Sequence, residues 1–237
     1  MKTSSFLLIG IIVLWTGIVY VVSSSPQPQM TPVAKAIAAT IPEEVQVKSK
    51  LDCPSSLQTL KKQRGIAEDS RFTTTPLIVI EKDTRHLGLY RRGVLDLEDD
   101  GTPKCWKVAL APQAPSGSKQ YEGDLRTPEG WYNVSDAAGS SYKDALLVHY
   151  PNCQDAKHGQ RAGFIKERLH KEICQAETHG ARPVQNSPLG GQILIHTGGY
   201  EDRVDWTLGC IALSAINLEK LRSSLPASKK TTVLILP

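Results

Sequence analysis

The sequence has little excess of either charge: 28 lysines and arginines stand against 24 aspartates and glutamates, a formal net charge of +4 over 237 residues. Nucleic-acid binders usually carry a clustered basic face and a higher isoelectric point, so this balance argues against a nucleic-acid partner. Hydrophobic residues make up 40% and charged residues 22% of the chain, which excludes global disorder, collagen and coiled coil. No internal repeat is visible, so the composition indicates an ordinary globular protein.

Long apolar runs are scarce, and one stands out at the N-terminus. Residues 6–22 are apolar except for Thr16 and two glycines, and Lys2 is the sole charge among the first thirty residues. This length fits a signal peptide or a short membrane anchor. No clean cleavage motif follows closely, which favours the anchor, and no cysteine follows that would indicate a lipoprotein. In both cases we expect an exported protein of the periplasm or cell envelope, inner-membrane anchored through residues 6–22 or secreted after cleavage.

The amino-acid composition divides the rest of the chain into two regions. Residues 23–75 begin with four prolines amid Ser, Gln and Ala, typical of a linker, and end in a short helical lead-in closed by Gly65. From Pro76 onward, short apolar runs alternate with turn residues. We therefore expect a signal peptide or anchor over 1–22, the linker and lead-in over 23–75, and one folded domain over 76–237.

The folded domain reads as mainly β with a few short helices. Helix signals are confined to residues 160–176 and 214–224, the second with Ser214 as N-cap. Apolar or alternating runs bounded by glycine, proline and polar residues predict strands over residues 77–80, 86–90, 104–110, 130–134, 145–150, 191–196 and 231–236.

A histidine and a cysteine stand at the ends of two of these elements. A predicted strand ends at His196, Gly198 and Gly199 interrupt it, and after a polar loop Gly209-Cys210 opens another apolar run. An imidazole that takes the thiol proton makes a cysteine a nucleophile, and two elements joined by one loop can bring the pair together. The backbone N–H groups of Gly209 and Cys210 would then face the developing oxyanion. A buried structural cysteine is the competing interpretation.

This segment resembles the catalytic motif of the L,D-transpeptidase family (YkuD, or ErfK/YbiS/YcfS/YnhG). The family shows a histidine, a glycine three residues on and, after a loop, Ser/Thr-x-Gly-Cys. The matching residues here are His196, Gly199, Thr207, Gly209 and Cys210. Other segments are similar to further family motifs in the same order, so that the resemblance covers nearly all of residues 76–237: Gly123 to Gly130 with Tyr132, Tyr150-Pro151-Asn152 with Asp155, and Leu87 to Gly93.

The resemblance implies an L,D-transpeptidase-type β-sandwich catalytic domain acting on peptidoglycan stem peptides. Cys210 would form a thioester at the L-centre of diaminopimelate, with His196 as its base, and pass the acyl group to an amine acceptor. The residue after the histidine, here Thr197, would orient the imidazole through its carbonyl. No metal or organic cofactor is expected. Candidate substrate-binding residues are Gly198, Gly199, Trp206 and Arg126, although packing of the loop is the favoured role of Trp206.

Two departures from the family pattern leave the acceptor open. Leu208 stands where many members have a histidine, and Ala212 where they have an arginine. This form is similar to the YafK-like branch, some members of which are associated with detaching lipoprotein from peptidoglycan. Besides transfer, the alternatives are therefore hydrolysis, by an L,D-carboxypeptidase or an enzyme releasing a wall-linked lipoprotein, and a non-enzymatic wall-binding protein.

The five cysteines are an odd number, which leaves one thiol unpaired in an oxidising compartment. Cys153 and Cys174 lie close in sequence to three histidines, but these spacings match no structural zinc module that we can name. For an exported protein we expect the disulfides Cys153–Cys174 and Cys53–Cys105. Four cysteines allow three pairings, so the sequence does not prove this connectivity. A zinc site formed by Cys153 and Cys174 with His158, His170 and His179 is the alternative to the second disulfide.

Overall fold

The computed structural model describes residues 53–112, 117–199, 205–226 and 231–237. The expected anchor or signal peptide and the proline-rich linker fall outside the described residues. No helix in the described part of the chain is both long and apolar enough to span a membrane. A compact unit extends over Ser49–Pro237.

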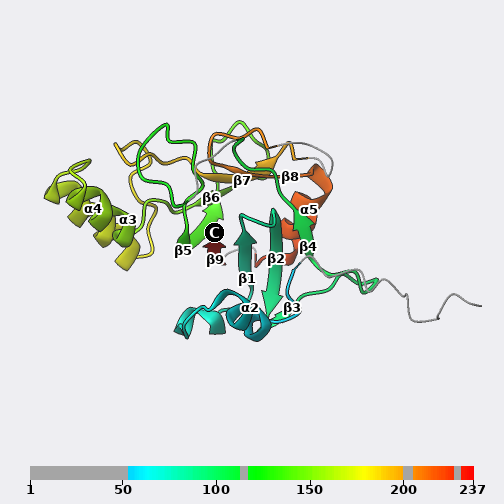
Figure 1. The fold of residues 1–237 in the computed structure, drawn as a ribbon. Coiled ribbons are helices and arrows are strands. Elements are labelled where there is room, and N and C mark those ends of the chain that lie inside the picture. Colours follow the sequence, from blue (N-terminus) through cyan, green and yellow to red (C-terminus); the bar gives the residue numbers. More distant parts are fainter. Residues whose placement is uncertain (1–52, 113–116, 200–204, 227–230) are drawn as a thin grey trace, which may run out of the picture. The chain divides into compact units, whose positions relative to one another are not determined.

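The secondary structure is mainly β with a few short helices, which confirms the predicted fold class (Figure 1). The helices are α2 (Leu57–Arg64), the 3₁₀ helix η1 (Ser70–Thr73), α3 (Cys153–Arg161), α4 (Glu167–Thr178) and α5 (Ala215–Ser224). The strands are β1 (Leu77–Glu81), β2 (His86–Arg91), β3 (Val94–Leu95), β4 (Cys105–Lys107), β5 (Gly130–Asp136), β6 (Leu146–Val148), β7 (Leu194–Thr197), β8 (Ile211–Leu213) and β9 (Thr231–Leu236).

All nine strands belong to one sheet, in the order β3-β2-β1-β9-β5-β6-β7-β8, with β4 pairing to β2. The pairs β1–β9 and β7–β8 are parallel and the others antiparallel. An antiparallel bridge between Ala109 and Ala212 connects the segment after β4 to β8, the last strand of this order. The sheet therefore curls until its far strand meets the chain leaving β4.

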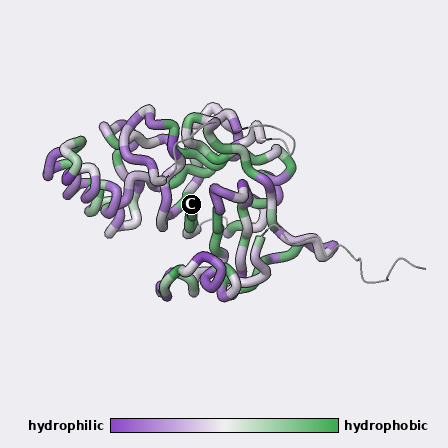
Figure 2. Tube along the Cα trace, viewed as in Figure 1, coloured by the Kyte–Doolittle hydropathy of each residue, from purple (hydrophilic) through white to green (hydrophobic). Residues whose placement is uncertain are grey.

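Both faces of the sheet are covered, as β1 shows. Its residues are all buried, and their side chains alternate between two hydrophobic clusters. Ile78 and Ile80 join the larger cluster, to which α5 contributes two leucines. Leu77 and Val79 join the second cluster, to which α2 contributes two leucines. Figure 2 shows the corresponding concentration of hydrophobic residues along the strands.

The helical lead-in is confirmed as α2. The Ser56 side chain accepts the N–H of Thr59 at its start, and Gly65 ends it in the left-handed conformation, at φ 62°. A disulfide between Cys53 and Cys105 ties the segment before α2 to β4. The lead-in thus packs onto the sheet that carries the candidate site.

The helix signals over residues 160–176 are confirmed by α4 and the end of α3, but helix is not confined to these residues, because α3 begins at Cys153. Asn152 and Asp155 form a capping box that begins α3 earlier than expected. The chain then breaks at Gly163, which has φ +80°. The second predicted helix is confirmed as α5, whose N-cap Ser214 accepts the N–H of Asn217.

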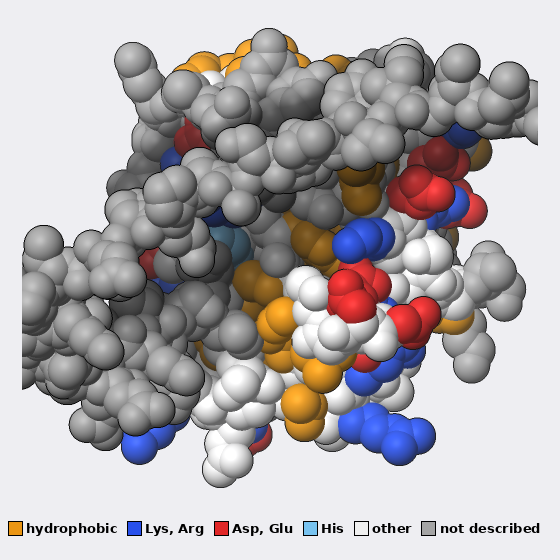
Figure 3. Space-filling model, turned by 90° about the vertical axis from the view of Figure 1, so that its right-hand side faces the viewer, with side chains coloured by type: hydrophobic (Ala, Val, Ile, Leu, Met, Phe, Trp, Pro, Cys, Tyr) orange, Lys and Arg blue, Asp and Glu red, His pale blue; other side chains and the backbone are white. Residues whose placement is uncertain are grey.

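Charges of both signs are mixed on the surface. On the face drawn in Figure 3, acidic and basic side chains lie next to one another. Arg64, for example, forms ion pairs with both Glu81 and Asp83. This distribution agrees with the small net charge.

Candidate active site

Two parallel strands bring His196 and Cys210 to one face of the sheet. His196 in β7 is the register partner of Ala212 in β8. Cys210 lies directly before β8, two residues from Ala212, and side chains two apart face the same side. Among the contacts of the described residues, none is a hydrogen bond between His196 Nε2 and Cys210 Sγ. Such bonds commonly tighten only when substrate is bound, so this diagonal placement is compatible with a nucleophile–base pair.

The backbone fixes the orientation of the His196 imidazole. Its Nδ1 lies 2.6 Å from the carbonyl oxygen of Thr197. A carbonyl oxygen can only accept, so Nδ1 carries the proton and Nε2 keeps its lone pair. The ring lies between Tyr142, at 4.0 Å between centroids, and the edge-on Trp206, at 5.7 Å. The side chain is therefore held as a base whose free nitrogen is Nε2.

Cys210 is the one cysteine of the chain outside a disulfide. The N–H of Leu194 donates to its sulfur at 3.4 Å. The thiol in turn donates to the carbonyl of Gln192 at 3.5 Å. The sulfur thus lies against the backbone that enters β7, and the donor from Leu194 would also stabilise a thiolate.

Burial acts on both groups in the same sense, towards the neutral form. It lowers the pKa of His196, partly opposed by the hydrogen bond to Thr197. It raises the pKa of the Cys210 thiol, opposed by the N–H of Leu194 and the charge of Lys119. The resting pair is therefore a neutral thiol and a neutral imidazole, and proton transfer belongs to the reaction step.

Of the two N–H groups predicted to face an oxyanion, that of Gly209 has a hydrogen-bond acceptor within the turn. The Gly209 N–H donates to Oγ1 of Thr207 at 3.3 Å, and that hydroxyl donates to the Cys210 carbonyl at 2.7 Å. Gly209 N–H is therefore used within the turn. The Cys210 N–H has no acceptor within the described residues, which makes it the better candidate for an oxyanion donor.

The packing of the backbone explains why residue 199 is a glycine, without any contact to substrate. Its N–H donates to the carbonyl of Leu213 at 2.9 Å. A Cβ built at position 199 would lie 2.4 Å from the carbonyl oxygen of Ala212. The close approach of the two backbones beyond His196 thus requires glycine, whereas the neighbouring Gly198 faces the ring of Trp206.

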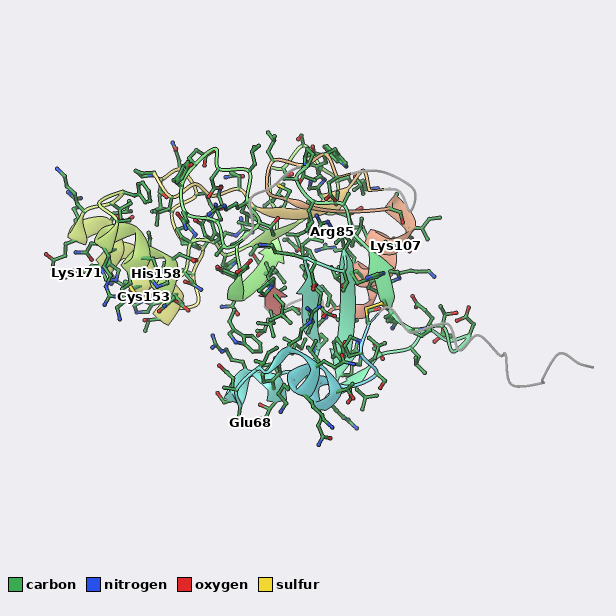
Figure 4. All side chains as sticks on the ribbon, in the orientation of Figure 1. Glu68, Arg85, Lys107, Cys153, His158 and Lys171 are labelled. Carbon is green, nitrogen blue, oxygen red and sulfur yellow. A yellow bond between two sulfur atoms is a disulfide. The ribbon has the colours of Figure 1, made fainter. Side chains whose placement is uncertain are left out.

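The segment before Cys210 is anchored to the sheet through Asp205. One carboxylate oxygen accepts from Arg85, at 2.7 Å from Nη2, and the other accepts the Leu110 N–H at 2.8 Å. Figure 4 labels Arg85, which lies in the turn between β1 and β2. The N–H groups of Trp206 and Thr207 both donate to the Leu110 carbonyl. These bonds place Trp206 against the imidazole, in agreement with the loop-packing interpretation.

Arg126 is placed close to the nucleophile by its backbone. Its carbonyl oxygen would lie 2.7 Å from a Cβ at Gly209. Its side chain has one weak contact, Nη1 to the Ser118 carbonyl at 3.5 Å, and its Nε is buried with no partner among the described residues. A guanidinium with unused donors fits the predicted carboxylate-binding role.

A cleft of about 780 Å³ opens beside Thr197. Its volume lies in the range of small-molecule sites. Carboxylates and cations share its walls, and Arg222 pairs there with Asp136. The lining includes Asp136, Lys143, Asp144, Thr197, Glu219 and Arg222. Neither His196 nor Cys210 is among the described residues that line this cleft, and α5, which forms one of its walls, packs against the face of β7 opposite to the His196 side chain.

The cysteine–histidine cluster around α3 and α4 has the disulfide that we expected. Cys153 and Cys174 are bonded, and Figure 4 labels Cys153 in α3. Ligand atoms of these two residues and of His170 lie within 4.8 Å of one another. Both sulfurs are used in the S–S bond, so neither is a thiolate ligand in this form of the protein. His170 Nδ1 bonds instead to Gln160 Oε1.

Two residues of the site were missed by the sequence reasoning. Tyr142 stacks on the imidazole from the loop between β5 and β6, and Lys119 lies buried beside Gly190, which shortly precedes β7. A single aromatic residue in a polar loop and a lysine before a turn carry no distinguishing pattern. Their roles follow from tertiary placement alone.

Comparison with known families decides what this fold and motif belong to. The model of the L,D-transpeptidase catalytic domain, YkuD, matches residues 75–235, which is more than half of the chain. The chain belongs to the L,D-transpeptidase catalytic domain family. The motif residues around His196 and Cys210 lie inside the matched region. The YafK-like branch stays a prediction.

Solved structures similar to this L,D-transpeptidase domain include three from bacteria. The helical cell shape determining protein Pgp2 from Campylobacter jejuni is 26% identical over 67% of this chain and 46% of its own, at a TM-score of 0.41. Bd1075 from Bdellovibrio bacteriovorus is 16% identical over 71% of this chain and 50% of its own, at a TM-score of 0.40. An L,D-transpeptidase from Mycobacterium tuberculosis is 13% identical over 68% of this chain and 57% of its own, at a TM-score of 0.34. The chain therefore spans about half the length of these proteins. Among curated protein sequences, none matches the chain.

Proposed function

We propose that the protein is an exported L,D-transpeptidase in which Cys210 is the nucleophile and His196 its base. The observation that carries this proposal is the bond from Nδ1 to the Thr197 carbonyl, which leaves Nε2 as an acceptor on the face of the sheet where the free thiol lies. A structural cysteine would need no such neighbour. Thr197 is thus an orienting residue, as the family resemblance implies.

The first half-reaction forms a thioester. The proton of the Cys210 thiol passes to Nε2 of His196 as the sulfur attacks the carbonyl carbon of the diaminopimelate L-centre. The resulting oxyanion accepts the N–H of Cys210. The C–N bond to the terminal D-Ala then breaks, and the imidazolium returns its proton to the leaving amine. The enzyme is left with an S-acyl cysteine and a neutral imidazole.

The second half-reaction releases the acyl group. An amine acceptor loses its proton to Nε2 while its nitrogen attacks the thioester carbon, the C–S bond breaks, and the proton returns to the sulfur. Arg126 and Trp206 are proposed to contact the donor stem, with Gly198 and Gly199 shaping the wall between them.

The same site can pass the acyl group to water. Leu208 and Ala212 replace residues that many family members have next to the nucleophile, and Leu208 is 75% exposed. This difference supports hydrolysis as the second candidate function: an L,D-carboxypeptidase, or an enzyme that detaches a wall-linked lipoprotein. In both candidates, residues 6–22 direct the chain to the envelope as a signal peptide or anchor, and residues 76–237 form the catalytic domain.

The products of a muropeptide assay separate these reactions. We expect the full-length chain, incubated with purified disaccharide-tetrapeptide, to give a cross-linked dimer with loss of D-Ala, measured by mass spectrometry. A tripeptide without dimer would identify hydrolysis instead, and lipoprotein freed from sacculi would identify the detaching reaction. Unchanged tetrapeptide together with no lipoprotein release from sacculi would contradict an enzymatic function and favour the wall-binding alternative.

A further inference from the structure

Lys119 is a buried cation that lies against Gly190, two residues before the Gln192 carbonyl that accepts the Cys210 thiol. Its side chain is 3% exposed and pairs with Asp124, also 3% exposed, at 2.8 Å. Its Nζ donates in addition to the Tyr121 carbonyl at 3.1 Å. Removing an ammonium from water is costly, and replacing such a pair with apolar residues is often neutral for stability. A buried pair at this place therefore suggests a role besides folding.

Asp124 is held ionised by its surroundings. Its carboxylate accepts Lys119, the Gln120 N–H at 2.6 Å and the Arg126 N–H at 3.1 Å. Burial would raise the pKa of Asp124, but Lys119 and these N–H groups lower it below its ordinary value. The carboxylate thus fixes the ammonium and the loop that carries it.

The loop of residues 119–127 packs against both backbone segments that flank the Cys210 sulfur. On one side, a Cβ at Gly190 would lie 2.8 Å from Cε of Lys119, two residues before the Gln192 carbonyl that accepts the thiol. On the other side, the hydroxyl of Thr127 donates to the Gly209 carbonyl at 3.0 Å. The ammonium is therefore fixed relative to the sulfur by contacts before β7 and before β8.

The other charges around the loop have partners or positions of their own. Lys82 pairs with Glu129 at 2.6 Å, and its Nζ also donates to the carbonyls of Gly117 and Thr127. The Glu122 carboxylate lies beside Gly190, on the same side as Lys119, and the Arg126 guanidinium points to Ser118. His196, on the β7 side of the thiol, is engaged by Thr197.

Lys119 is the cation whose field lowers the pKa of the thiol, against the effect of burial. We propose that Lys119 is a positioning residue for the reaction at Cys210, its ammonium stabilising the thiolate and Asp124 moderating that effect. This inference rests on the proposed role of Cys210 as nucleophile.

The test measures how fast the full-length chain is alkylated by iodoacetamide as a function of pH, without reductant. Cys53, Cys105, Cys153 and Cys174 are in disulfides, so the signal reports Cys210. We expect Lys119→Met to raise the midpoint of the profile by up to about one pH unit, since the variant removes a positive charge that Asp124 partly neutralises. Asp124→Asn leaves the ammonium unneutralised and should lower the midpoint. Lys119→Arg keeps the charge and should stay near the wild-type value.

Opposite shifts from the two partners distinguish electrostatics from structure, because a merely structural ion pair would give the same effect whichever partner is lost. An unchanged midpoint in Lys119→Met, or shifts of the same sign in the two variants, would overturn the proposal. If Lys119→Met does not fold, the midpoint of Asp124→Asn is compared with that of Lys119→Arg. A lower midpoint in Asp124→Asn supports the proposal, and an equal or higher midpoint overturns it. Alkylation needs no substrate, so a chain without muropeptide activity but with opposite shifts would refute the proposed function and leave this inference standing.

Discussion

Gly209 shows how a single residue serves the site by having no side chain. Its φ is +121°, where residues with a Cβ are strained. A Cβ there would also lie 2.7 Å from the carbonyl oxygen of Arg126. Glycine therefore permits both the turn before Cys210 and the contact between that turn and the Asp124 loop. The sequence signal, a glycine before a cysteine, indicated the position, but only the structure names the neighbour.

We expect Gly209→Ala to destabilise the fold more than an open glycine does. The strain and the collision together should cost about 3 kcal/mol or more. Gly101→Ala is the matched control, since Gly101 has φ +83° with nothing within 4 Å of the added Cβ, and it should cost about 1 kcal/mol. Urea unfolding measures both, and equal losses would show that the contact with Arg126 does not matter.

The candidate pair illustrates what residue patterns can predict. His196, Cys210 and Thr197 were predicted from their spacing and the family motif; in the structure β7 and β8 pair beside them, and the Thr197 carbonyl accepts from His196, while their catalytic roles stay a proposal. Lys119 and Tyr142 were not found, because a lone lysine or tyrosine in a polar loop has many uses. Their proximity to the pair depends on how distant segments pack, which local spacing does not encode.

Among the elements, α3 joins the sheet through one buried acid. Asp155 accepts the N–H of the N-cap Asn152 at 2.9 Å and the hydroxyl of Tyr132 in β5 at 3.0 Å. Burial raises the pKa of Asp155 to about 7; the Asn152 N–H and Tyr132 lower it and Glu177 raises it. The first turn of the helix thus carries a carboxyl group that titrates near neutral pH.

This acid predicts a pH dependence of stability. The folded value is raised above the ordinary 3.8, so between about pH 4 and pH 7 the folded state holds a proton that the unfolded state has lost. The free energy of unfolding should therefore fall by about 2 to 4 kcal/mol as pH rises through this window and level off above it. Asp155→Asn cannot titrate and should lose this part of the slope in urea unfolding at pH 5 and pH 8. Identical slopes in the two proteins would contradict the assignment.

Elements were predicted better where burial is uniform than where it is not. The apolar runs of β1 and β9 need only their composition to be identified, and both strands are where the pattern placed them. The helix signals over residues 160–176 did not show that two helices meet there, because a sequence pattern does not reveal whether a glycine ends one helix or is tolerated within it. Gly163 at φ +80° is a break.

At the scale of the whole chain, the odd cysteine count has a physical account. The structure pairs Cys53 with Cys105 and Cys153 with Cys174, the arrangement that we expected, and leaves Cys210 free. One bond fastens the lead-in to the sheet and the other joins α3 to α4. The sequence alone left three pairings open, because contacts between distant segments decide among them.

The central claim, that Cys210 carries the acyl group, is tested most directly by intact-mass measurement. The full-length chain is mixed with disaccharide-tetrapeptide, quenched in acid and weighed, and the modified peptide is sequenced. The account predicts an added mass equal to the substrate less D-Ala, located on Cys210, and neither adduct nor turnover in a folded Cys210→Ala variant. An adduct on another residue, or undiminished turnover in Cys210→Ala, would contradict it.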